Sequence, residues 1–139
     1  MEDTALKEID NTISVCFASD GNYVPYMGIA ILSVLKSSFP DDNFRFYILD
    51  NEISEEGKKQ IESLADISRP FNIEFIKINT EKFYHCDFQE KRLTPAIFCR
   101  YFIPRYIKED KVLYLDCDIM ARSSLSELWN TDLEYNYVA

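Results

Sequence analysis

The stretch ISVCFASDGNYVPYMGIAILSVLKSSF, residues 13–39, decides the fold that the sequence predicts. Its first part, 13–19, is a short and mostly apolar run, which is typical of a strand covered on both faces of a parallel sheet. Its last part, 25–39, predicts a helix, because Pro25 suits a first turn and apolar residues then recur along one face. That apolar face consists of Met27, Ile31, Val34 and Leu35.

The alternation of strand and helix continues downstream. FRFYILD (44–50) predicts a second strand, and a helix follows from a cap at Ser54 to about Asp66. Gly57 stands where a capping box would place Glu. NIEFIKI (72–78) alternates apolar and polar residues, which predicts a third strand with one wetter face.

The rest of the chain predicts one more helix and one more strand. Residues 79–92 show no clear period and are expected to form a loop. Thr94 is expected to cap a helix that starts at Pro95 and bends or ends just before Pro104. KVLYLD (111–116) predicts the fourth strand. This order predicts an α/β fold, with a mostly parallel sheet and helices on both of its faces.

The predicted domain organisation is simple. Residues 1–12 are expected to form an N-terminal arm, and residues 13–139 a domain that is incomplete at its C-terminus. The reason is that LEYNYVA (133–139) resembles the start of another strand. A sheet without its later strands would expose an unpaired edge, so we expect self-association.

Composition and charge exclude some function classes. The net charge is −9 with no basic patch, which argues against nucleic-acid binding. The four cysteines lack the C-x-x-C spacing of zinc sites, and Cys16, Cys99 and Cys117 lie in apolar patterns, as reduced core thiols do. Reduced cysteines, together with the lack of a signal peptide and of a long apolar segment in this sequence, predict a cytoplasmic location. His85, the single histidine, is expected on a surface loop.

Two aspartates end the fourth predicted strand, in KVLYLDCDIMA (111–121). In a strand, Asp116 and Asp118 would project together while Cys117 faces the other side. They would lie at the carboxyl end of the strand, where open α/β sheets bind ligands. Two hard oxygen donors suit Mn²⁺ or Mg²⁺, which could in turn carry a diphosphate. The alternative is that these aspartates simply begin a turn.

Polar residues also follow the first strand, in FASDGNY (17–23). This segment has neither the G-x-G-x-x-G pattern nor a P-loop lysine. Asp20 and Asn22 could hydrogen-bond a base or ribose, and Tyr23 could stack on a ring. The alternative is a turn in which these side chains cap the next helix.

Three stretches together closely resemble glycosyltransferase family 8, which includes bacterial lipopolysaccharide galactosyl- and glucosyltransferases and glycogenin. They are FASDGNYVPYMGIAILSVLKSS, RLTPAIFCRYFIPRYI and KVLYLDCDIMARSSLSELWNTDL. The resemblance runs from Ile13 onward. It implies a GT-A fold, in which a Rossmann-like half binds a nucleotide sugar that is usually UDP-linked. It also implies Mn²⁺-dependent transfer of a hexose to a glycan or lipopolysaccharide acceptor with retention of configuration.

The resemblance also implies roles for individual residues. Asp116 and Asp118 would be metal ligands, and the backbone of Cys117 would lie near the ribose or diphosphate. Arg100 would approach the donor sugar and the diphosphate as the catalytic residue; its alternatives are a solvent-exposed arginine or a salt bridge to Asp118. The remaining donor-binding residues would be Ala18, Ser19, Asp20, Asn22, Tyr23, Leu93 and Thr94.

Family members are roughly twice this long, and the missing half normally supplies a metal-binding histidine, a lysine on the diphosphate and the acceptor pocket. The chain by itself is therefore expected to bind donor weakly and to be nearly inactive. The parent protein could lie at the inner membrane surface. Two alternatives stay open: a non-catalytic metal–nucleotide binding module, and a phosphatase whose D-x-D motif supplies a nucleophile.

Overall fold

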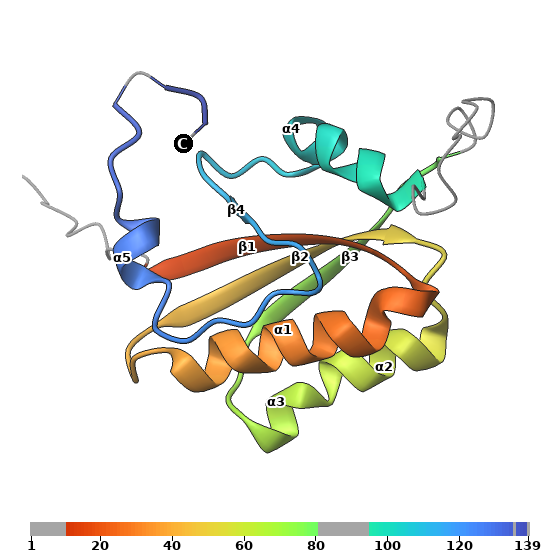
Figure 1. The fold of residues 1–139 in the computed structure, drawn as a ribbon, viewed down its shortest axis with the longest axis horizontal. Coiled ribbons are helices and arrows are strands. Elements are labelled where there is room, and N and C mark those ends of the chain that lie inside the picture. Colours follow the sequence, from red (N-terminus) through yellow and green to blue (C-terminus); the bar gives the residue numbers. More distant parts are fainter. Residues whose placement is uncertain (1–10, 81–94, 135, 139) are drawn as a thin grey trace, which may run out of the picture.

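The centre of the molecule is a four-stranded parallel sheet (Figure 1). The computed structural model describes residues 11–80, 95–134 and 136–138. The strands stand in the order β3, β2, β1, β4, and all three pairings are parallel. Their bounds are β1 Thr12–Asp20, β2 Asn43–Asn51, β3 Asn72–Lys77 and β4 Leu113–Tyr114. The predicted α/β class and the mostly parallel sheet are confirmed.

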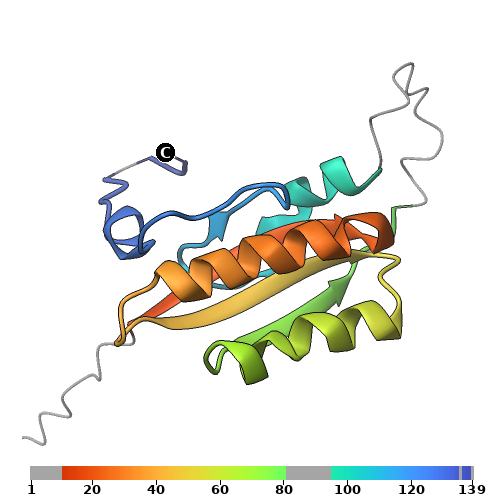
Figure 2. The ribbon, with the colours of Figure 1, turned by 60° about the horizontal axis from the view of Figure 1, so that its bottom comes forward.

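Helices cover both faces of this sheet, as predicted (Figures 1 and 2). One face carries the α-helices that follow β1 and β2, and the other carries the helical segment that precedes β4. The bounds are η1 Gly21–Tyr23, α1 Val24–Ser37, α2 Glu55–Glu62, α3 Leu64–Ile67, η3 Pro95–Phe102, α4 Ile103–Tyr106 and α5 Ser126–Trp129. No helix in the described parts of the chain is both long enough and apolar enough to cross a lipid bilayer.

The apolar run of β1 supplies both halves of the core, because successive side chains of a strand point to opposite faces. Ile13, Val15 and Phe17 pack with the buried face of α1. Cys16, between them, belongs to the second apolar cluster, which includes Cys99 of η3. Both faces of the sheet are therefore covered along β1, which agrees with the mostly apolar sequence of this strand.

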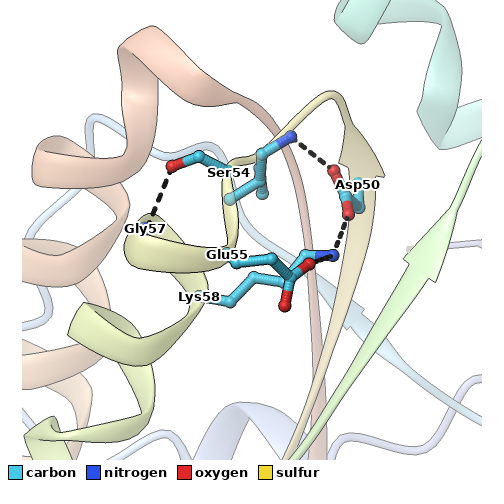
Figure 3. A network of polar contacts seen from close by, with 6 residues as sticks. Asp50, Ser54, Glu55, Gly57 and Lys58 are labelled. Atoms are coloured by element: carbon cyan, nitrogen blue, oxygen red, sulfur yellow. Dashed lines mark hydrogen bonds and ion pairs between the residues drawn. The ribbon is translucent and has the colours of Figure 1, made fainter.

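The connection from β2 to α2 is fixed by a buried carboxylate (Figure 3). The Asp50 side chain is buried; its Oδ1 accepts the Ile53 N–H at 2.7 Å, and its Oδ2 lies 3.0 Å from Lys58 Nζ. The Ser54 hydroxyl accepts the Gly57 N–H at 3.1 Å, which is the predicted cap of α2. A buried charge is tolerated here because it has both an ion-pair partner and a hydrogen-bond donor.

Packing explains the glycine in this cap. A Cβ added at Gly57 would lie 3.2 Å from Ile53 Cγ2 and 3.4 Å from Val24 Cγ2. Contacts this short would force the neighbours to move. The close approach of the start of α2 to α1 therefore favours glycine where the helix by itself would prefer Glu.

One predicted helix differs in type and another in extent. The segment from Pro95 is a 3-10 helix that ends at Phe102, next to the boundary predicted near Ile103, and α4 begins at Ile103. Pro104 is tolerated because it occupies the first turn of α4, where the N–H that it lacks would have no helical partner. The helix that was expected to run to Asp66 is divided at Ser63 into α2 and α3. Thr94, the expected cap, lies outside the described residues.

Two predicted strands also differ. The fourth strand was expected over 111–116, but β4 contains only Leu113 and Tyr114. Beyond it, the Leu115 N–H still donates to Cys16 O at 2.9 Å before the chain turns away from the sheet. The segment 133–139 forms no strand in its described residues; instead it turns, with the Asn136 N–H donating to Leu133 O.

Candidate functional site

The polar residues that follow β1 and those that follow β4 come to the same edge of the sheet, because these neighbouring strands are parallel. After β1 the chain adds β2 and then β3 on one side, and then returns to place β4 on the other side of β1. The helices that follow β1 and β2 lie on one face, and the helical segment that precedes β4 lies on the other (Figure 2). Open α/β sheets bind their ligands beside the carboxyl ends of the strands at such a switch point.

The loop after β1 is held by Asp20, the last residue of the strand. Its Oδ1 accepts the N–H groups of Asn22 at 2.9 Å and Tyr23 at 3.2 Å. The capping turn that the sequence offered as the alternative role is therefore present. The Tyr23 side chain remains 45% exposed and packs beside Tyr26, with 5.6 Å between the ring centroids. The turn fixes one carboxylate oxygen and leaves an accessible aromatic ring.

The loop after β4 exposes two carboxylates on either side of a buried thiol. Asp116 and Asp118 are exposed, whereas Cys117 is only 7% exposed. The two aspartates therefore face solvent while the cysteine between them faces the interior, as the sequence predicted. The cause is different, because β4 ends at Tyr114: Asp116 lies beyond the strand, and Cys117 and Asp118 lie in a turn.

The Cys117 thiol joins the loop after β4 to the end of β1. Its Sγ donates a hydrogen bond to the carbonyl oxygen of Ala18, 99 positions earlier in the chain, at 3.2 Å. Burial raises the pKa of this thiol to about 12, against a hydrogen bond with Ser19 that lowers it. Three nearby carboxylates contribute to the same rise in the pKa: Asp116, Asp118 and Asp20. The acidic groups of both loops therefore lie within electrostatic reach of one buried sulfur.

Arg100 reaches this loop from the last turn of η3. Its Nη2 lies 3.5 Å from Asp116 Oδ1, and its Cζ lies 5.0 Å from the centroid of the Tyr114 ring. The side chains of Arg100 and Asp116 are 41% and 56% exposed. A salt bridge to Asp118 was the expected alternative, but the structure places the guanidinium against Asp116.

The donor set suits a hard dication. Asp116 and Asp118 offer exposed carboxylate oxygens of the kind that Mn²⁺ and Mg²⁺ prefer. Within the described ranges, no group of three His, Cys, Asp or Glu side chains could hold a metal ion. An ion bound by these two residues would therefore keep positions open for oxygens of a ligand.

One buried polar pair beside the site was not predicted from the sequence. The Thr80 hydroxyl donates to Asn51 Oδ1 at 2.9 Å, and both side chains are buried. Asn51 is the sheet partner of Asp20, so this pair supports the loop from the neighbouring strand. Two polar residues, Asp50 and Asn51, directly after an apolar strand are the signal that could have revealed it. The predicted residues Leu93 and Thr94, and His85, lie outside the described residues.

Comparison with known proteins relates this arrangement to one family. Residues 14–139 match the family model described as Glycosyl transferase family 8. Glycosyltransferase GlyB of Streptococcus pneumoniae is 31% identical over 128 residues, which cover 89% of this chain and 30% of GlyB. Lipopolysaccharide 1,3-galactosyltransferase of Salmonella typhimurium is 27% identical over 128 residues, covering 91% of this chain and 37% of that protein.

A solved structure shows the same fold. The galactosyltransferase LgtC, crystallised with donor and acceptor sugar analogues, superimposes with a TM-score of 0.78 at 36% sequence identity. The match covers 87% of this chain and 43% of LgtC. The chain spans less than half the length of the curated relatives that it matches.

Proposed function

The chain belongs to glycosyltransferase family 8, and we propose that it carries the donor-binding half of an enzyme that transfers a hexose from a UDP-sugar to a glycan or lipopolysaccharide acceptor. We further propose that transfer depends on Mn²⁺ and retains the anomeric configuration. The observation that carries the proposal is the hydrogen bond from Cys117 Sγ to Ala18 O. It ties the loop that carries the two exposed carboxylates to the end of β1, which leads into the loop proposed to bind the nucleoside.

Each loop has a distinct role in this proposal. Asp116 and Asp118 would hold the dication, which, when bound, would neutralise charge on the diphosphate leaving group. Arg100 would direct its planar fork of N–H groups at phosphate oxygens and sugar hydroxyls, a geometry that a guanidinium suits better than an ammonium. The Cys117 backbone would lie near the ribose or diphosphate.

The loop after β1 would bind uridine. Asp20 would face the uracil edge and Tyr23 would stack on the base, with Ala18, Ser19 and Asn22 completing the contacts. Two backbone N–H groups already fix one Asp20 oxygen, so the carboxylate is oriented before a ligand arrives. Such preorganisation favours binding because less side-chain freedom is lost.

Titration calorimetry with UDP tests this proposal. We expect UDP binding that requires Mn²⁺, and we expect Asp118→Ala to weaken it at least about tenfold, which corresponds to about 1.4 kcal/mol. Asp66→Ala is the matched control, because Asp66 is an exposed aspartate on α3, outside the loops that follow β1 and β4. Binding by the wild type without metal, or an Asp118→Ala variant with unchanged affinity, would contradict the proposed donor site.

Activity assays separate the alternatives. A binding module would bind UDP and Mn²⁺ without transferring sugar even in the full-length protein. A phosphatase would release phosphate steadily from an aryl phosphate with Mg²⁺, an outcome that family membership makes unexpected. We also propose a cytoplasmic location, and association of copies through the edge strand β4; a monodisperse monomer in light scattering would contradict the association.

A further inference from the structure

Arg100 and Asp116 form an ion pair at the proposed metal site. The guanidinium lies 3.5 Å from Asp116 Oδ1 and rests over the ring of Tyr114, 5.0 Å from its centroid. Tyr114 belongs to β4, so the ring that supports the guanidinium is part of the sheet. The positive charge of Arg100 therefore already lies against a carboxylate that is proposed to bind the dication.

We propose that Arg100 opposes metal binding when no nucleotide is present, and that a nucleoside diphosphate removes this opposition. This inference rests on the proposed function. A guanidinium and a dication that share Asp116 repel each other, and the repulsion is strong at short range. The oxygens of a diphosphate offer Arg100 a second anionic partner. Metal and nucleotide then bind more tightly together than either binds alone, a coupling that is reciprocal.

The exposure of the pair allows this exchange. Both side chains are more than one-third exposed, and ion pairs this accessible to water are weak. The guanidinium can therefore be released without leaving a buried charge unpaired. A deeply buried pair would instead have locked Arg100 in place.

Mn²⁺ binding measured by electron paramagnetic resonance, with and without UDP, tests this role. Without UDP, we expect Arg100→Gln to bind Mn²⁺ about three- to tenfold more tightly than the wild type, because a neighbouring positive charge is gone. With UDP present, we expect the variant to bind Mn²⁺ no more tightly than the wild type does. The factor by which UDP increases Mn²⁺ affinity is therefore at least about three- to tenfold smaller in the variant than in the wild type. Arg100→Lys keeps the charge and should stay near the wild type.

Arg105→Gln is the matched control. Arg105 follows on α4 and also rests over a tyrosine ring, that of Tyr106 at 5.7 Å, but it forms no ion pair with an aspartate in the part of the chain that the structure describes. The Arg105→Gln substitution removes the same charge as Arg100→Gln. It should nevertheless leave Mn²⁺ affinity within about twofold of the wild type, because exposed charges at a distance are screened by salt.

The outcomes separate this inference from the proposed function. A wild type that binds no Mn²⁺ in the presence of UDP would overturn both. If the wild type binds Mn²⁺ with UDP, two results would overturn the role of Arg100 alone: an Arg100→Gln variant with no tighter Mn²⁺ binding than the wild type without nucleotide, or an equal gain in Arg105→Gln.

Discussion

Cys117 shows how a single buried side chain shapes an exposed site. The sequence suggested a contribution from its backbone only, through resemblance to a family. In the structure its thiol also fixes the position of the loop, because it donates to Ala18 O while the flanking aspartates remain exposed. The carboxylates need no direct contact with the first loop to be placed beside it.

The same burial predicts low reactivity at this residue. Burial raises the pKa of the Cys117 thiol to about 12, so almost no thiolate exists at pH 8. We expect the Cys117 peptide to be alkylated by iodoacetamide at least about tenfold more slowly in the native than in the urea-unfolded protein, as measured by peptide mass spectrometry. Equal rates in the two states would show that the thiol is not buried as described.

At the scale of elements, the start of α2 shows why packing can override a helix preference. Ser54 caps the helix as its sequence predicts, and Asp50 anchors the preceding turn from the end of β2. Gly57, in contrast, is a glycine in the first turn of a helix, and helices disfavour glycine. Its neighbours on α1 and in the turn leave little room for a side chain, so the contact between elements decides this position.

Loss of the cap should destabilise the protein measurably. We expect Ser54→Ala to lower the free energy of unfolding by about 1 kcal/mol, because the Gly57 N–H loses its acceptor. Urea unfolding followed by circular dichroism measures the change. Ser63→Ala is the control: its exposed hydroxyl donates to Gln60 O at the other end of α2, and its loss should cost less than about 0.5 kcal/mol. Equal losses in the two variants would argue against the cap.

At the scale of the whole molecule, Asp42 ties the later part of the chain to the start of the sheet. The hydroxyls of Ser124 and Ser126, more than 80 positions away, donate to its two carboxylate oxygens. The Phe39 N–H donates to the same carboxylate at 2.8 Å. These bonds hold α5 beside the beginning of β1, as Figure 1 shows.

This carboxylate should make stability depend on pH. Burial acts to raise the pKa of Asp42, but hydrogen bonds from Ser126, Ser124 and the Phe39 N–H outweigh it and hold the pKa below its ordinary value of 3.8. The folded state then favours the charged form. Its contribution to stability is present above pH 3.8 and is lost as the pH falls through the lower pKa of the folded protein.

Urea unfolding at pH 7 and at pH 3 measures this contribution. At pH 7 we expect Asp42→Asn to be less stable than the wild type by about 1–2 kcal/mol, because hydrogen bonds to a charged acceptor are lost. At pH 3 the difference should be smaller, because this pH lies below 3.8, where the unfolded chain binds the proton and the contribution of the charged carboxylate decreases. Asp41→Asn, at the exposed neighbouring position, should differ little from the wild type at pH 7. A constant deficit of Asp42→Asn at both pH values would contradict the assignment.

The sequence by itself determined the order of strands and helices and the family. Both depend on local information: the period of apolar residues over a few turns, and short motifs such as Asp116–Cys117–Asp118. It predicted the boundaries less well. Pro104 correctly predicted a boundary near Ile103 but not the short helix α4 that begins there, and β4 ends at Tyr114, two residues before the predicted end of the strand.

Only the tertiary structure decided which distant residues meet. The contacts of Cys117 with Ala18, and of Arg100 with Asp116, depend on how segments far apart in the chain pack across the sheet. No local pattern encodes these distances, because they follow from the strand order and from the helices that cover each face. The motif thus fixed the chemistry of the candidate site, and the fold fixed its partners.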